Sequence, residues 1–195
     1  MPKRLEFWFD VGSPTAYLAH TQMPGIAERT GAEIAWKPML LGGVFKATGN
    51  TPPGTVEAKS AYYGIDLPRF ARRYGVPFRR NPFFPIMTLG LMRGCLAAQR
   101  DGCFQTYADA VFTAMWVEEK NTGDPDVLRE VLTAAGLDAD ALFAATQEPA
   151  IKQQLIDNTE EAVSRGAFGA PTFFVGDEMF FGQDRLDFVE EALAS

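Results

Sequence analysis

The chain has 195 residues, of which 47% are hydrophobic, and this is enough for one substantial core. Its formal net charge of −7 argues against nucleic acid as a partner, because such surfaces need clustered positive charge. No apolar run approaches the roughly 20 residues that span a bilayer, and "MPKRLEFWFD" reaches an acidic residue too early for a signal peptide, so we expect a cytoplasmic location and no membrane partner.

The first third of the chain predicts a βαβ unit. Residues 5–9, "LEFWF", are aromatic and too short for a helix, which indicates a buried strand. Ser13 is a good N-cap and Pro14 suits the first helical position, so one helix is expected from here toward Gly31. "AEIAWKP" then alternates as a second strand does, and the right-handed crossover rule favours parallel pairing of the two strands.

The middle of the sequence indicates helices without an intervening strand. Residues 39–54 are expected to form a loop or a broken helix, and the helical segment that follows is expected to be interrupted at Pro68. Four further helices are expected over residues 86–101, 104–120, 126–135 and 150–165, the third of them started by Asp124-Pro125. We therefore interpret residues 40–160 as an all-helical block.

Strands return at the C-terminal end. "TFFV" at 172–175, a Gly176-Asp177 turn and a strand over 179–181 predict a hairpin, followed by a helix from about residue 184. A hairpin here completes a sheet begun at the N-terminus. The expected fold is therefore α/β, with a split domain of residues 1–39 and 161–195 around a helical insertion of residues 40–160.

Cysteine and histidine usage limits the chemistry. Cys95 and Cys103 are eight positions apart, so they form neither a CxxC redox pair nor a metal knuckle, and plain packing is the favoured interpretation. His20 is the sole histidine, which excludes a multi-histidine metal site and favours a packing or surface role over catalysis. We expect no metal.

Ser13 lies where a strand meets a helix. The free N–H groups and the positive end of the helix dipole favour an anion at such a position. From local sequence alone the favoured interpretation is a helix cap, and a capping role is compatible with binding. A second short motif, "GAPTFF", places Pro171 just before a strand, where a cis peptide occurs in some tight turns.

Four motifs in order give a resemblance over essentially the whole length. They are "FWFDVGSPTAYLA", "LLGGVFKATGN", "NPFFP" and "GAFGAPTFFVGDEMFFGQDRLDFVEEAL". The chain resembles the 2-hydroxychromene-2-carboxylate isomerases, which belong with kappa-class glutathione transferases in the DsbA-like branch of thioredoxin folds. The resemblance implies a thioredoxin-like βαβ…ββα domain with a large helical insertion.

The resemblance implies glutathione as cofactor. Disulfide oxidoreductases of this fold carry a reactive cysteine at the start of the first helix, whereas this chain has Ser13 there and Ala16 three residues on. Disulfide exchange through a CxxC pair is therefore impossible. A serine hydroxyl and the helix dipole instead stabilise the thiolate of a bound thiol and lower its pKa.

Further glutathione contacts are implied by the family pattern. The main chain of Ala170, before an expected cis Pro171, would hold the peptide backbone of glutathione in a strand-like contact. Gln183 and Asp184 would meet the γ-glutamyl end, with Asp184 suited to its amino group and also to an N-cap role. Arg185 is a further candidate, for which a surface ion pair is the alternative.

Substrate contacts are implied at Lys46, Asn50 and Asn81. A carboxylate-bearing substrate approaching a net-negative protein requires a local cation and directional donors, which Lys46 and Asn50 supply. A solvent-facing lysine is the alternative for Lys46. Phe83 and Phe84 either wall an aromatic pocket or pack, while Trp8 and Trp36 are expected in the core.

The activity implied is conversion of 2-hydroxychromene-2-carboxylate to trans-o-hydroxybenzylidenepyruvate in naphthalene-type aromatic degradation, through a glutathione thiolate stabilised by Ser13. A homodimer is also implied. Two alternatives stay open: a kappa-like glutathione transferase or peroxidase, and a non-catalytic thioredoxin-fold binding protein.

Overall fold

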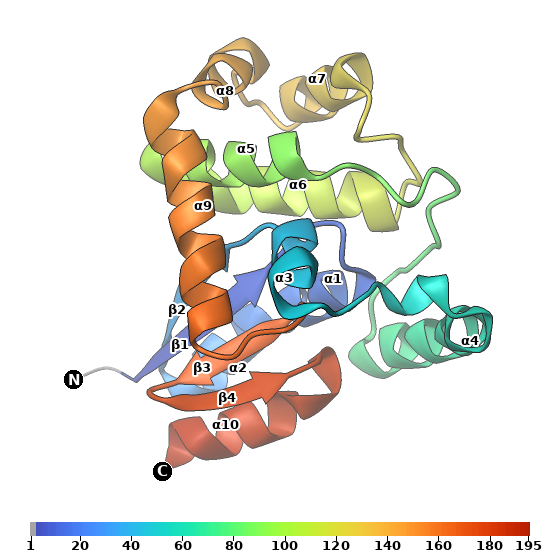
Figure 1. Ribbon diagram of the computed structural model, residues 1–195, viewed down its shortest axis with the longest axis vertical. Coiled ribbons are helices and arrows are strands. Elements are labelled where there is room, and N and C mark those ends of the chain that lie inside the picture. The colour runs from blue at the N-terminus through green and yellow to red at the C-terminus, as the bar shows by residue number, and fades with distance from the viewer. Residues whose placement is uncertain (1–2) are drawn as a thin grey trace.

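Four strands form one mixed sheet in the computed structural model, which describes residues 3–195 (Figure 1). The strands are β1 (Arg4–Phe9), β2 (Glu33–Pro38), β3 (Thr172–Val175) and β4 (Glu178–Phe181), in the order β2-β1-β3-β4. β2 runs parallel to β1, whereas β3 is antiparallel to both β1 and β4. The expected parallel pair and the closing hairpin are both confirmed.

Helices surround the sheet and extend beyond it. They are α1 (Pro14–His20), α2 (Met23–Thr30), α3 (Leu41–Thr48), α4 (Glu57–Tyr74), α5 (Leu89–Arg100), α6 (Phe104–Trp116), α7 (Pro125–Ala134), α8 (Ala139–Ala145), α9 (Pro149–Ser164) and α10 (Leu186–Ala194), with short 3-10 turns η1 (Pro53–Thr55) and η2 (Gln183–Arg185). Figure 1 shows α5 to α8 gathered at the end of the molecule away from α10. The split-domain division stays a prediction, and its expected boundary at 160/161 falls inside α9.

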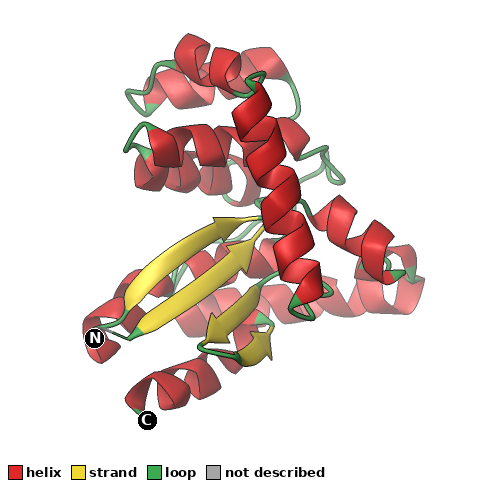
Figure 2. Cartoon of the chain, turned by 60° about the vertical axis from the view of Figure 1, so that its left-hand side comes forward, coloured by secondary structure: helices red, strands yellow, loops and turns green. Residues whose placement is uncertain are grey.

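The alternation of side chains along β1 divides the core in two. Leu5, Phe7 and Phe9 are fully buried in the larger cluster, with α1, α2, α5, α6 and α10. Trp8 points to the opposite face, where it packs with Val44 of α3 and residues of α9. Figure 2 shows α9 crossing in front of the strands. Because the sheet is covered on both faces, the last three residues of β1, Phe7 to Phe9, are all apolar and fully buried.

The single helix expected from Ser13 toward Gly31 is two helices. α1 ends at His20 and α2 begins at Met23, with Thr21 and Gln22 between them. Pro24 is the physical reason, because its missing N–H and its ring prevent a bond to the carbonyl four residues earlier. Proline is well tolerated in the first turn of a helix, which is where α2 has it.

One expectation for the helical block was also wrong. α4 is continuous through Pro68, because burial of Leu67 and Ala71 packs the helix on both sides of the proline. The segment 39–54, expected as a loop or a broken helix, contains the helix α3, which ends at Gly49 with φ of 72°, and then the short turn η1. α8 was not expected as a separate helix.

Candidate functional site

Three chain connections meet at one edge of the sheet. β1 and β2 are parallel, so both end there, and β3 is antiparallel to β1, so it begins there. The register pairs Trp8 with Thr172. The residues after Phe9 therefore lie beside the residues before Thr172, although they are far apart in the sequence.

Ser13 is the N-cap of α1 at this edge. Its backbone is extended, with φ of −93° and ψ of 117°, and its Oγ accepts a hydrogen bond of 3.1 Å from the Ala16 N–H. The residue is only 4% exposed. The free N–H groups of the first turn of α1 give this buried hydroxyl a positive electrostatic environment.

The Ser13 hydroxyl meets the residue before the cis proline. Ser13 Oγ lies 3.1 Å from the carbonyl oxygen of Ala170, to which it donates. The Ala170–Pro171 peptide is cis, as the resemblance implied. Two residues that the sequence singled out separately therefore form one site.

Thr15 is a member of this site that sequence reasoning missed. Its Oγ1 lies 3.1 Å from Ala170 O, to which it donates, and 2.8 Å from Ser13 Oγ. Two hydroxyls thus converge on one carbonyl oxygen. The signal that could have found Thr15 is its position, because N2 of a helix lies next to the N-cap side chain.

Asp10 fixes the connection that carries Ser13. Its carboxylate accepts hydrogen bonds from Gly12 N (2.9 Å), Leu41 N (2.8 Å) and Thr88 Oγ1 (3.0 Å), which join the connection to α3 and to the start of α5. Burial raises the pKa of Asp10, while these three hydrogen bonds act in the opposite direction. A Cβ on Gly12 would lie 2.7 Å from Thr88 Cγ2, so the close approach requires glycine.

The turn η2 carries the three residues that were expected to meet the γ-glutamyl end, Gln183, Asp184 and Arg185. Gln183 is buried, and its carbonyl oxygen accepts a 2.5 Å hydrogen bond from the hydroxyl of Tyr74 in α4. Asp184 is exposed, and its Oδ2 lies 2.6 Å from Arg185 Nη1. Gly182 precedes the turn with φ of 99°, and a Cβ there would lie 2.5 Å from Asp184 Oδ1.

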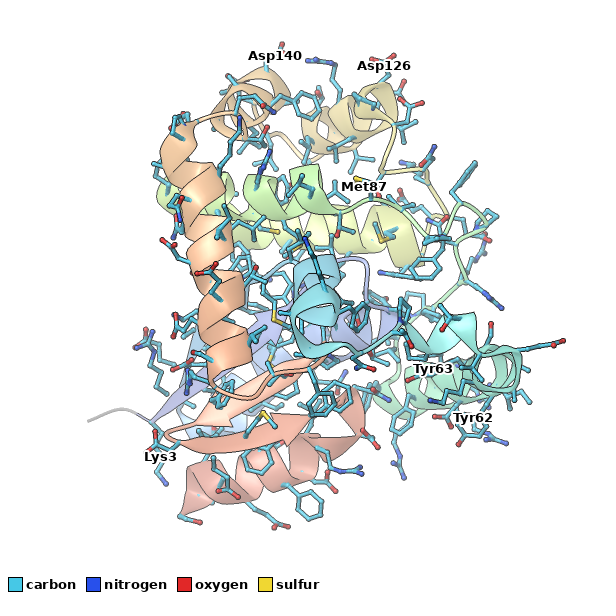
Figure 3. The ribbon with its side chains drawn as sticks, viewed as in Figure 1. Lys3, Tyr62, Tyr63, Met87, Asp126 and Asp140 are labelled. Atoms are coloured by element: carbon cyan, nitrogen blue, oxygen red, sulfur yellow. The ribbon has the colours of Figure 1, made fainter. Side chains whose placement is uncertain are left out.

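Burial, together with the charge of Asp184 in this turn, contributes to the raised pKa values of two tyrosines in α4. Burial, followed by the charge of Asp184, raises the pKa of Tyr74 to about 12. The same two causes raise the pKa of Tyr63, which Figure 3 labels on α4. Tyr74 is therefore a hydroxyl donor to Gln183 over the whole neutral range.

Asn50 lies next to the segment that leads to Ala170. Its Nδ2 donates a 2.9 Å hydrogen bond to Phe168 O, two residues before Ala170, and its Oδ1 accepts from Thr51 N. Lys46 lies exposed in the last turn of α3. Within the part of the chain that the structure describes, Lys46 makes no ion pair.

Asn81 is not available for the expected substrate contact. It is 2% exposed, its Nδ2 donates to the carbonyls of Met115 and Lys120, and its Oδ1 accepts from Phe83 N. Both amide protons are therefore used by the main chain. We correct the expected role of Asn81 to holding the turn before cis Phe84–Pro85 against the end of α6.

The remaining reactive side chains are part of the packing. Cys95 is fully buried, which raises the pKa of its thiol well above the usual value, and Cys103 is partly buried with a raised pKa for the same reason. His20 is 6% exposed, with Nε2 2.6 Å from Asp109 Oδ1. Among residues 3–195, no group of three metal-ligating side chains converges.

None of the helices between residues 3 and 195 combines the length and the apolar character that crossing a membrane requires.

Comparison with known proteins agrees with this architecture. The family described as DSBA-like thioredoxin domain matches residues 4–194. A protein named 2-hydroxychromene-2-carboxylate isomerase from Sphingobium xenophagum is 36% identical over 199 residues, which cover 99% of this chain and 99% of that protein. The chain belongs to the 2-hydroxychromene-2-carboxylate isomerase family within the DSBA-like thioredoxin domains.

Two further proteins are similar to this chain over nearly its whole length. The solved structure of a selenomethionine 2-hydroxychromene-2-carboxylate isomerase has a TM-score of 0.88 and 28% identity, covering 98% of this chain and 94% of that one. Glutathione S-transferase kappa 1 of Caenorhabditis elegans is 29% identical, over 99% of this chain and 92% of its own length. The relatives support an isomerase or a glutathione transferase-like function.

Proposed function

We propose that this chain is a glutathione-dependent isomerase that converts 2-hydroxychromene-2-carboxylate to trans-o-hydroxybenzylidenepyruvate in the degradation of naphthalene-type aromatic compounds. The observation that carries the proposal is the 3.1 Å contact between Ser13 Oγ and Ala170 O at the start of α1. This contact puts a hydroxyl donor, a helix N-terminus and the main chain before the cis proline in one place. The relatives that carry the isomerase name support the substrate class.

The residues at the site fit glutathione. Within residues 3–195 the N–H of Ala170 has no hydrogen-bond partner, so it is free for the peptide backbone of a ligand. Asp184 is exposed and negative at η2, where it would bind the amino group of the γ-glutamyl end. Gln183 and Arg185 flank it on the same turn. The kappa-class relatives, which are named glutathione transferases, support this choice of ligand.

Ser13 would hold the sulfur in its ionised form. Bound glutathione supplies a thiolate nucleophile that the chain itself lacks. The Ser13 Oγ–H turns from Ala170 O to the sulfur, while the Thr15 hydroxyl keeps its own bond to Ala170 O. The proton of Ser13 stays on Oγ throughout. Because the site is buried, this hydrogen bond and the α1 dipole would stabilise the thiolate more than the same groups would in water.

The substrate carboxylate would lie on the α3 side of the site. Lys46 supplies a positive charge in a chain of net charge −7, and Asn50 lies beside the segment that leads to Ala170. Phe84 packs on Trp116 with ring centroids 5.7 Å apart and is 41% exposed, so it offers an aromatic wall nearby on the chain connection before α5.

A kappa-like glutathione transferase or peroxidase is the second candidate, favoured by the 29% identity to a kappa-class transferase. The two functions differ in their balance of glutathione. An isomerase returns free glutathione after each turnover, whereas a transferase or a peroxidase consumes it.

The test mixes purified protein, glutathione and 2-hydroxychromene-2-carboxylate. We expect the ultraviolet spectrum to change to that of the ring-opened product, at a rate that depends on glutathione, with the free thiol concentration constant. Loss of free thiol in step with product would favour the transferase. No spectral change together with no calorimetric binding of glutathione would leave the non-catalytic binding protein.

A further inference from the structure

A pocket lies between α3, α5 and α9. It has a volume of about 420 Å³ and is partly open to solvent. In Figure 1, α3 lies in front of the sheet, with α9 to its left and α5 above it. The apolar part of the lining comes from Leu40, Leu89, Leu155, Ile156 and Val163. A volume in this range and an apolar lining are typical of small-molecule sites.

Two cations line this otherwise apolar pocket. They are Arg93 of α5 and Lys152 of α9, against one carboxylate, Glu160. Neither cation forms an ion pair with any residue from 3 to 195, although most arginines of the chain do. The pocket therefore carries a positive charge that the protein does not neutralise.

The guanidinium of Arg93 also has a donor without an acceptor. Its Nε is buried and has no hydrogen-bond partner among the described residues. The hydroxyls of the lining are already used, since Thr159 Oγ1 donates to Leu155 O and accepts from Leu40 N, and Ser164 Oγ donates to Glu161 O. Arg93 forms no hydrogen bond with any residue from 3 to 195, and because its Nε is closed to solvent, a ligand in the pocket would bind the terminal nitrogens of the guanidinium.

We propose that this pocket binds a monocarboxylate with an apolar tail, with the carboxylate on Arg93 and Lys152 and the tail against the leucines. The anionic head binds the terminal guanidinium nitrogens of Arg93 and, together with Glu160, balances the two cations. The apolar tail removes the leucine side chains from water.

The pocket is separate from the Ser13 site. Ser13, Ala170 and Asp184 do not line it. Gly43 and Ala47 of α3 face the pocket, whereas Asn50, just beyond the same helix, bonds to the segment before Ala170. A ligand here would therefore contact the helix whose first amide, Leu41 N, is bonded to Asp10. This proposal needs no glutathione and does not rest on the proposed function.

The test uses decanoate as the probe and isothermal titration calorimetry as the measurement, without glutathione. We expect saturable binding of one decanoate per chain, weakened at least about tenfold by Arg93→Met and about threefold by Lys152→Met. Methionine keeps the apolar bulk of each side chain. Arg72→Met, at an exposed position on α4, is the matched control and should leave the affinity unchanged. Decan-1-ol should bind equally to the wild type and to Arg93→Met.

Three results would overturn the proposal: no saturable binding of decanoate, equal affinity in wild type and Arg93→Met, or displacement of decanoate by glutathione. The last result would put the probe in the Ser13 site. Failure of the isomerase assay with normal decanoate binding would reject the proposed function alone.

Discussion

Two helices of this protein begin with the same local pattern, a capping residue followed by proline, and one of these two starts lies at the candidate functional site. Ser13-Pro14 starts α1 and Asp124-Pro125 starts α7. Each cap accepts from a nearby backbone N–H, at 3.1 Å from Ala16 and 2.9 Å from Asp126. The local chemistry of the two helix starts is therefore alike.

The two helix starts differ in the residues that the rest of the fold places beside the capping side chain. Asp124 is exposed, and the only hydrogen bond of its side chain within residues 3–195 is the local one. Ser13 is buried and bonds to Ala170, 157 residues away. A cap stabilises its helix wherever it lies, but it becomes a candidate catalytic group only where the tertiary structure places a second functional group beside it.

The largest expected effect is a difference in kcat between variants of the two capping residues. Ser13→Ala should lower kcat about 100-fold or more, because one preorganised donor to a developing or ionised charge typically contributes this much. Asp124→Ala should leave kcat unchanged. Both variants should lose about 1 kcal/mol of unfolding free energy, measured by urea denaturation, because each removes one cap. Full turnover in Ser13→Ala would reject the catalytic role of that hydroxyl.

The second-largest expected effect is on the KM for glutathione and comes from Asp184, a carboxylate in the helical turn η2. Asp184→Asn should raise the KM for glutathione about tenfold, because it removes a charge-assisted hydrogen bond to the ligand amino group. Asp140→Asn, in the first turn of α8 and labelled far from η2 in Figure 3, is the control and should not change the KM. An unchanged KM in Asp184→Asn would limit Asp184 to its pairing with Arg185.

A pH dependence of stability should follow from Asp10, the buried residue that fixes the Ser13 connection. Its pKa in the folded state is raised above the usual value of 3.8, so the folded state binds the proton more tightly than the unfolded state. The unfolding free energy should therefore fall as pH rises from about 4 through the raised pKa, by less than about 1.4 kcal/mol per pH unit.

The Asp10 contribution is measured by urea denaturation at a series of pH values, as the difference between wild type and Asp10→Asn. That difference should decline with rising pH over this window and stay constant above it. A difference that grows with pH would mean that the hydrogen bonds from Gly12, Leu41 and Thr88 outweigh burial.

The smallest expected effect tests the Thr15 hydroxyl, the second donor to Ala170 O. Thr15→Val removes the donor that keeps Ala170 O bonded when Ser13 turns to the sulfur, and we expect kcat to fall about threefold. Thr15→Ser keeps the hydroxyl and should restore wild-type turnover. Equal rates in the valine and serine variants would show that the Thr15 hydroxyl takes no part.

Much of the fold follows from local sequence. The strand expected over 5–9 is β1, the hairpin expected around Gly176-Asp177 is β3 and β4, and Ser13 caps a helix as expected. These features depend on side-chain alternation, turn residues and capping, which act over a few neighbouring residues. The break before α2 was also available locally, in Pro24, and was overlooked.

Other features depend on packing between distant segments, which local patterns do not encode. Pro68 stays within α4 because its neighbours are buried against other elements. Asn81 was expected at the substrate, but the carbonyls of Met115 and Lys120 take both of its amide protons. Thr15 gained a role only because Ala170 lies opposite it.

By itself, the sequence determined the strands of the sheet, the helix start at Ser13 and the absence of a CxxC pair, because each is a property of neighbouring residues. Only the tertiary structure decided that Ser13, Thr15 and Ala170 lie together, and that a pocket forms between α3, α5 and α9. The antiparallel register of β1 and β3 is the physical reason for the first, since it fixes which remote residues share an edge of the sheet. The packing of α3, α5 and α9 is the reason for the second.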